Sequence, residues 1–302
     1  MGKYLVALSS FAVASAQTAH AAKGPLVLAP VSEWSTAQED GVCILRRDFQ
    51  AGRKTLTLEF SSFSYDPFFQ VRLVSKGISV YVQGGGLGYS YSRFEPDKGF
   101  GKRENGYNKV IKGGKRGVFF TGSVFSNDLL YQSAEGTRQF EDLIVDYALR
   151  DRREREITAL RMSRPYRHEV LIETGELHTP MTSFRSCLGD LALKEGLDPD
   201  KLATLSRRPQ PKDIQAWADQ LALKVPLVTT YPTGFQVIEI RLTIDPSGKP
   251  IDCRLRDNLE DVNFYRSACK TSLEQAEFNP ALDSTGKPSA GYYTTRLVVR
   301  GD

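Results

Sequence analysis

The sequence predicts an α+β protein with a β-rich N-terminal domain that ends in a helix, followed by a small second domain. Three observations indicate this class. Alternating apolar residues recur from Trp34 to Val82, apolar residues at helical spacing follow over residues 179–196, and a hairpin, a helix and a last strand fill residues 235–300. At 302 residues the chain is long enough for two domains that each bury a core.

Residues 1–21 have the features of a secretory signal peptide. A short positive start precedes an apolar stretch, Leu5–Ala14, and a small-residue cleavage site. The apolar stretch is shorter than the roughly 20 residues that span a bilayer. We therefore expect an exported mature chain without a membrane span. Without Lys3 the chain has 39 basic residues against 36 acidic ones, and a net charge of +3 is too small to indicate a nucleic-acid partner.

The N-terminal domain is predicted to cover residues 22–205. Its strands are expected in VCILRRDF, TLTLEF and FFQVRLVS, then in GVFFTGSV and HEVLIETG, because these segments alternate and are separated by Gly and Pro breaks. A helix over residues 179–196 follows, which Thr179 and Pro180 open and Gly196 closes. Its apolar stripe is Met181, Phe184, Cys187, Leu188 and Leu191.

Residues 93–116 form a basic stretch that is also rich in glycine and tyrosine. The composition indicates a long loop or an extended hairpin. Basic residues with interleaved aromatics suit an anionic surface, so binding of an envelope polyanion is a second functional hypothesis, although most charge runs are solvated faces. The expected contacts are Arg93, Lys98, Lys102, Arg103, Lys109, Lys112, Lys115 and Arg116.

A polar segment with two prolines, within residues 206–217, is predicted to link the two domains. In the second domain, residues 218–302, Ile240 and Leu242 alternate with Glu239 and Arg241 and so predict a strand with one core face and one wet face. A Pro-Ser-Gly turn leads into a second alternating strand, and a helix from Val262 to about Glu277 and a last strand over residues 292–299 follow.

Four cysteines in an exported chain favour disulfides over metal ligands, because no C-x-x-C spacing is present. Cys253 lies on the second strand of the hairpin and Cys269 on the helix that should cover it, so these two are expected to pair. A bridge across about 16 residues would contribute on the order of 3 kcal/mol. Cys43 and Cys187 remain as a second pair, but four cysteines allow three pairings and the sequence does not fix which one forms.

From Phe235 to Arg300 the chain resembles the TonB C-terminal domain family. The resemblance is carried by a strand, the D-x-x-G-x-P turn, a strand with Asp-Cys, a helix ending in A-E-F-N-P-A, the turn D-x-x-G-K-P and a terminal strand, in that order. With its N-terminal region the chain looks like the two-domain, signal-peptide-bearing proteins that carry a TonB-like C-terminal domain. The resemblance implies a three-stranded antiparallel sheet packed on one helix, located in the periplasm.

The resemblance also implies the kind of partner. Family members dock short peptide segments of outer-membrane transporters, which physically is addition of a strand to an exposed sheet edge. The edge expected here is Tyr292, Tyr293, Thr294, Thr295, Arg296, Leu297, Val298 and Val299. A homodimer through the same strand is a further expectation that the sequence leaves open. The chain departs from the membrane-anchored transducer of the family, because its signal has a cleavage site and its linker is short; the transducer reading returns if the signal stays uncleaved.

The sequence offers no set of residues for catalysis, a cofactor or a metal, and we expect a protein that is not an enzyme. His168 and His178 could serve a nucleophile, but no G-x-S-x-G segment is present. Glu173-Thr174-Gly175 is similar to the D-T-G motif of aspartic proteases, but it has glutamate in place of the aspartate and occurs once, whereas these enzymes need two aspartates. The segment is therefore interpreted as the end of a strand. A hydrolase of unfamiliar type is the third and weakest hypothesis.

Overall fold

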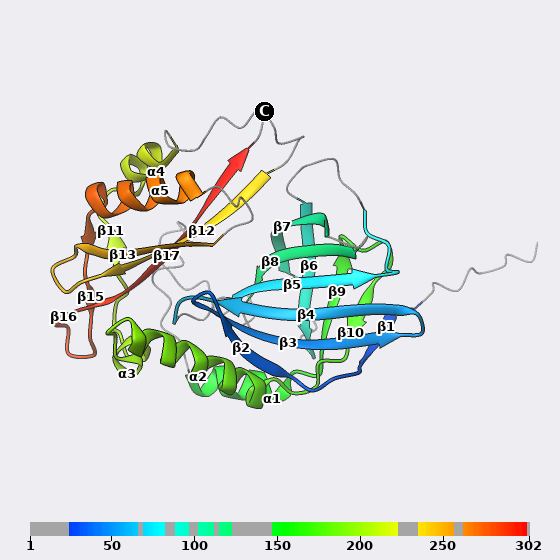
Figure 1. The fold of residues 1–302 in the computed structure, drawn as a ribbon. Coiled ribbons are helices and arrows are strands. Elements are labelled where there is room, and N and C mark those ends of the chain that lie inside the picture. Colours follow the sequence, from blue (N-terminus) through cyan, green and yellow to red (C-terminus); the bar gives the residue numbers. More distant parts are fainter. Residues whose placement is uncertain are drawn as a thin grey trace, which may run out of the picture.

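The structure is a computed structural model that describes residues 24–65, 69–81, 88–96, 102–111, 115–122, 147–222, 235–256 and 262–300. In this part of the chain the protein is mixed α+β, rich in strands and poor in helices, which confirms the predicted fold class at that level. Figure 1 shows a large curled sheet next to a smaller sheet that carries helices on its far side.

Ten strands of the described residues form the large sheet. In sheet order they are β1 (Leu26–Pro30), β10 (Val170–Ile172), β9 (Ala159–Arg164), β6 (Gly88–Glu95), β7 (Lys102–Ile111), β8 (Lys115–Gly122), β5 (Phe69–Lys76), β4 (Lys54–Ser62), β3 (Val42–Ala51) and β2 (Ser35–Glu39). β1 pairs in parallel with β10 and antiparallel with β3, so the sheet curls round and closes on itself (Figure 1).

The core of this closed sheet follows from the alternation in β3, β4 and β5. Successive side chains of a strand point to opposite faces, and here one face holds Leu45, Phe49 and Leu58, each at most 1% exposed. Trp34 stacks on Phe60 with ring centroids 5.7 Å apart. The strands predicted from VCILRRDF, TLTLEF and FFQVRLVS are therefore present, and their apolar faces make one core.

The described residues up to Ala203 also form three helices: α1 (Tyr147–Glu156), α2 (His178–Lys194) and α3 (Pro199–Ala203). α2 corresponds to the helix predicted over residues 179–196. It packs on β2 and β3 and buries Met181, Phe184 and Leu188 of the predicted stripe. Figure 1 shows α2 reaching from the closed sheet to the smaller sheet. Below, residues 24–203 are called the N-terminal region and residues 206–300 the C-terminal region.

The C-terminal region contains a three-stranded antiparallel sheet in the order β13 (Pro250–Arg256), β12 (Phe235–Ile244) and β17 (Gly291–Arg300). The helices α4 (Ile214–Ala222) and α5 (Val262–Gln275) contact each other, and α5 packs on β13. Two short ladders complete the region, β11 (Gln210–Pro211) with β14 (Phe278–Asn279) and β15 (Ala281–Leu282) with β16 (Pro288–Ser289). Trp217, Leu242 and Tyr293 meet in its core.

The segment 206–217, expected as a linker, is built into the C-terminal region. β11 pairs with β14, Arg207 pairs with Leu282, and Trp217 is 4% exposed in the core. The expectation was wrong because backbone pairing of Arg207, Gln210 and Pro211 fixes this segment without any apolar pattern in the sequence.

Two turns of the C-terminal region have the same sequence pattern and the same hydrogen bonds. In each, an aspartate, Asp245 or Asp283, accepts backbone N–H groups two and four residues later. Gly248 and Gly286 have φ of 88° and 81°, which favours glycine. A Cβ on Gly248 would also lie 2.2 Å from the carbonyl oxygen of Phe278, whereas nothing lies within 4 Å at Gly286. Gly248 is thus constrained twice and Gly286 once.

Candidate functional site: an edge strand held against the N-terminal region

β17 lies at one edge of the three-stranded sheet. It pairs with β12 residue for residue, from Gly291 opposite Ile244 to Arg300 opposite Phe235, without a register shift. In the described part of the chain β12 is the only ladder partner of β17. Within the described residues β17 is therefore an edge strand, and its role in binding stays a prediction.

The two edges of this sheet differ in how well they could template another strand. β13 is seven residues long, starts at Pro250 and is shifted in register near Thr243. Proline and irregular pairing both protect an edge against further pairing. β17 is ten residues long, regular and rich in aromatic and β-branched residues. Of the two edges, β17 is the better template for an added strand.

The polar face of the three-stranded sheet is buried and not exposed to solvent, contrary to the prediction. Glu239, Arg241 and Thr243 alternate with the apolar core residues of β12, yet they are only 5%, 0% and 2% exposed. The alternation correctly separates two faces, but it does not reveal that the N-terminal region covers the polar one. Arg241 finds partners in that region, Glu239 pairs with Arg256 of β13, and the Thr243 hydroxyl has no hydrogen-bond partner among the described residues.

Arg241 is the centre of this contact. Its Nη2 lies 2.8 Å from Oε1 of Glu195 and 3.3 Å from Oδ2 of Asp252, and its Nη1 donates to the carbonyl oxygen of Phe63. The guanidinium carbon lies 4.5 Å from the ring centroid of Tyr292 and 5.6 Å from that of Phe63. A buried arginine is thereby paired with carboxylates and enclosed by two aromatic rings, as the planar guanidinium allows.

Glu195, at the end of α2, collects three donors from the C-terminal region. Besides Arg241, the Nη2 of Arg254 lies 3.0 Å away, and the Tyr292 hydroxyl donates over 2.6 Å. Burial and the hydrogen bond to this carboxylate raise the pKa of Tyr292 well above its usual range. Glu195 therefore ties β12, β13 and β17 to the N-terminal region at a single carboxylate.

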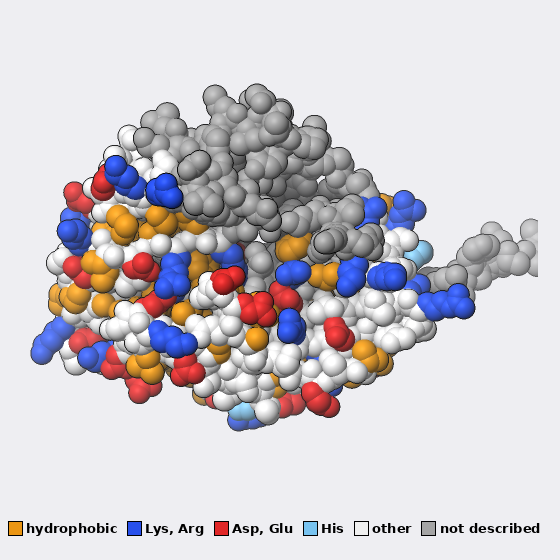
Figure 2. All heavy atoms as spheres, viewed as in Figure 1, with side chains coloured by type: hydrophobic (Ala, Val, Ile, Leu, Met, Phe, Trp, Pro, Cys, Tyr) orange, Lys and Arg blue, Asp and Glu red, His pale blue; other side chains and the backbone are white. Residues whose placement is uncertain are grey.

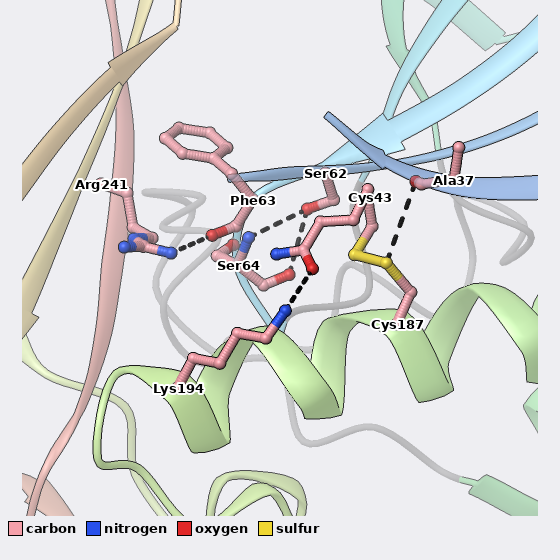
Figure 3. Close-up of a disulfide and its surroundings, with 9 residues drawn as sticks. Ala37, Cys43, Ser62, Phe63, Ser64, Cys187, Lys194 and Arg241 are labelled. Carbon is pink, nitrogen blue, oxygen red and sulfur yellow. Dashed lines mark hydrogen bonds between the residues drawn. A yellow bond between two sulfur atoms is a disulfide. The ribbon is translucent and has the colours of Figure 1, made fainter. Parts of the chain in front are cut away.

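A second contact lies at the end of β4. Arg256 donates to Glu239 from Nε over 2.9 Å and to the Ser61 hydroxyl over 3.1 Å. The Thr294 hydroxyl of β17 donates to that of Ser64 over 3.1 Å. Figure 3 shows Arg241 pointing toward the backbone of Phe63 beside Ser62 and Ser64. The first half of β17 is therefore held by the N-terminal region through its side chains.

Both expected disulfides are present. Cys43 and Cys187 join β3 to α2, and Cys253 and Cys269 join β13 to α5, with S–S distances of 2.02 and 2.01 Å. The described residues contain no free cysteine. Figure 3 shows the Cys43–Cys187 bridge to one side of the contact between Arg241 and Phe63, with Cys187 on the same helix as Lys194. This bridge fixes the helix whose end carries Glu195.

The described residues of the basic stretch are built into the large sheet as the paired strands β6 and β7 and the start of β8, which is the extended hairpin of the two expected forms. Arg93 lies 3.1 Å from Glu95. Lys115 is exposed and Arg116 half-buried on β8. Lys102, Arg103 and Lys109 lie on β7, and Lys98 and Lys112 lie outside the described residues. On the face drawn in Figure 2, acidic and basic side chains are interspersed over the described residues.

Asp151, Glu154 and His178 gather between α1 and α2, with potential ligand atoms within 4.8 Å of one another. Glu154 is fully buried, and both of its oxygens accept from Arg185, over 2.6 and 3.0 Å. His178 contacts Arg155 over 2.8 Å. Because arginines surround these carboxylates, the cluster is best explained as an ion-pair network that joins the two helices. In the described part of the chain, the hydrogen bonds and ion pairs of the His178 imidazole are with Arg155 and Glu154.

The residues that hold the C-terminal region were not found from the sequence. Glu195 is 46 positions from Arg241, and Phe63 is 178 positions from it. Neither residue belongs to a motif. The only indication in the sequence was Arg241 itself, which lies between two core residues of its strand. An arginine in that position needs a partner if its face of the sheet is covered.

No family model, curated protein or solved structure was found to match the chain. Among the described residues, none of the helices combines the length and the apolar character needed to cross a bilayer. The predicted signal peptide, residues 1–21, lies outside the described residues.

Proposed function

We propose that the protein is a non-enzymatic periplasmic protein whose C-terminal region binds an extended segment of a protein partner by strand addition to β17. The observation that carries this proposal is the edge position of a ten-residue strand with regular pairing on its inner side. A strand at an edge presents backbone donors and acceptors in register, and an extended peptide satisfies them. The signal-like residues 1–21 support export.

The resemblance to the TonB C-terminal domain family supports the same proposal from the sequence. The order of two strands, a helix and a terminal strand agrees with the elements β12, β13, α5 and β17. On this reading the protein has two domains, the second of them TonB-like, and is accessory to TonB-dependent transport, with a segment of an outer-membrane transporter as partner. N-terminal sequencing of the exported chain separates this reading from that of an anchored transducer.

The contact between the two regions adds a role for the N-terminal region within this proposal. The polar face of the small sheet is enclosed by Glu195, Phe63 and Ser64, whereas the opposite face packs on α4 and α5. With both faces covered, the edge is the part of this sheet where a partner's backbone can pair. The N-terminal region thus serves as a scaffold that limits recognition to strand addition.

The test is a titration of the isotopically labelled full chain with ten-residue peptides from periplasm-facing segments of outer-membrane transporters. The proposal predicts shifts of the backbone amides of residues 291–300. The amides of β13, at the other edge, serve as the internal control and should stay unchanged. Shifts confined to β13, or no shifts at either edge, would remove the proposal. Sedimentation of the free chain shows whether a second copy already occupies β17.

A further inference from the structure

One end of the large sheet carries exposed basic side chains from separate parts of the chain. It is the end at which β1, β4, β8 and β10 begin. Below it is called the basic end, and its exposed cations are Arg53, Lys54, Lys76, Lys115, Arg164 and Arg167. Figure 2 shows Lys, Arg and His side chains gathered there, at the right of the view, over the part of the large sheet that lies away from the smaller sheet in Figure 1.

Strand pairing brings these cations onto one surface. β4, β5 and β8 are adjacent in the sheet, and Lys54, Lys76 and Lys115 lie at the ends of these strands on the same side. From β5 the chain continues to the connection between β9 and β10, where the Arg167 N–H donates to the Ser79 carbonyl oxygen over 3.0 Å. Cations that are far apart in the sequence therefore lie at the same end of the sheet.

The described part of the chain places one carboxylate, that of Glu169, at the basic end. This carboxylate lies 3.0 Å from the Nη1 of Arg161. Residues 82–87 and 112–114, which precede β6 and β8 in the sequence, contain no Asp or Glu. Exposed charges of one sign add up to a positive potential over the surface, and this potential attracts anions within about a Debye length.

Two exposed apolar side chains accompany the cations. Tyr81 is 47% exposed, and the guanidinium carbon of Arg167 lies 5.8 Å from its ring centroid. Val27, the second residue of β1, is 43% exposed. At a bilayer surface such side chains enter the boundary between headgroups and acyl chains, while Lys and Arg contact the phosphates. A soluble polyanion offers charge without an apolar layer, so this combination favours a bilayer.

We propose that the basic end is a docking surface for an anionic lipid bilayer. The chain enters the large sheet at this end, because the Leu26 N–H donates to the Glu169 carbonyl oxygen over 2.8 Å. The segment predicted as a secretory signal, residues 1–21, therefore precedes this surface directly. Because the smaller sheet lies on the other side of the large one in Figure 1, a docked protein presents β17 away from the lipid.

The experiment measures sedimentation of the full exported chain with two kinds of vesicle, phosphatidylcholine alone and equal parts of phosphatidylcholine and phosphatidylglycerol. At low salt the anionic vesicles should bind the protein at least about tenfold more tightly, and added salt should weaken this preference. The triple variant Lys54→Gln, Lys76→Gln, Lys115→Gln should bind them roughly a hundredfold more weakly, since each lysine near an anionic bilayer is worth roughly a factor of five.

The matched control is the triple variant Lys249→Gln, Lys270→Gln, Lys287→Gln. These lysines are exposed in the C-terminal region, and their replacement changes the net charge by the same amount. Binding of the control to anionic vesicles should stay within about twofold of the wild type, because its charges lie more than a Debye length from the docked surface. Tyr81→Ser should weaken binding severalfold at low and at high salt. Thermal unfolding of each variant checks that the fold is retained.

A soluble polyphosphate chain is the second probe. If polyphosphate binds through the same lysines and the anionic vesicles do not bind, the partner is a soluble polyanion and the bilayer proposal is wrong. Equal binding to both kinds of vesicle, or equal losses in the two triple variants, would also overturn it. Strand addition at β17 is tested separately by its amide shifts, so a failure of either proposal leaves the other standing.

Discussion

From the contact at Glu195 we predict how much free energy of unfolding the protein loses when this carboxylate is removed. In Glu195→Gln the shape of the side chain is kept, but Arg241, fully buried, loses the carboxylate that lies 2.8 Å from its Nη2. Asp252 remains at 3.3 Å, although its side chain is 47% exposed and so interacts more weakly. Breaking a buried pair by removing one partner is worth 3–5 kcal/mol, so with Asp252 left in place we expect a loss of about 3 kcal/mol.

Chemical and thermal unfolding of the full chain measure this loss. For a domain of the size of the N-terminal region, about 3 kcal/mol corresponds to a decrease in Tm of roughly 6–12 °C. The matched control is Glu277→Gln, because Glu277 is 73% exposed and its ion pair with Lys212, at 3.2 Å, should contribute under about 1 kcal/mol. Equal stability of the two variants would refute the reasoning. A double variant with Arg241→Met should show coupling on the order of 1–3 kcal/mol.

Three further predictions concern other parts of the chain. Gly248→Ala should destabilise the protein by at least about 2 kcal/mol more than Gly286→Ala in urea unfolding, since both require positive φ but only the first also meets a carbonyl oxygen at 2.2 Å; equal losses would contradict this. Replacing Cys43 and Cys187 by serine should cost about 5 kcal/mol, because their bridge closes 144 residues, and a loss under about 2 kcal/mol would argue against the loop-entropy account. Burial raises the pKa of Glu95, but hydrogen bonds from two arginines lower it below 4.5 overall. Its stabilisation is therefore complete above about pH 4.5 and is lost as the pH falls through the folded pKa, so wild type and Glu95→Gln should differ at neutral pH and converge in acid.

Several elements could be predicted because short-range patterns determine them. The strands around Leu45 and Leu58, the helix that buries Phe184, and the hairpin with Ile240 and Leu242 all follow from alternation or helical spacing. The disulfide at Cys253 also followed, because strand and helix lie close in sequence. These predictions depend on side chains whose neighbours lie within one or two elements along the chain.

α1 could not be predicted for a related reason. Its sequence, YALRDRRERE, has no apolar face, so periodicity gives no signal. The helix is placed by contacts with a distant element, since Glu154 pairs with Arg185 of α2 and lies 3.5 Å from the Nδ1 of His178, also of α2. A helix that depends on ion pairs with another segment becomes visible only when that segment is in place.

By itself, the sequence determined the fold class, the apolar faces and the terminal strand of the small sheet, because each depends on the order of residues within one element. Only the tertiary structure decided what covers the other face of that sheet. Alternation shows that Arg241 and Thr243 point away from the core, but the cost of burying Arg241 depends on whether Glu195 and Phe63, far away along the chain, arrive with a carboxylate and a carbonyl. Those partners come from another part of the fold, so no local pattern encodes them.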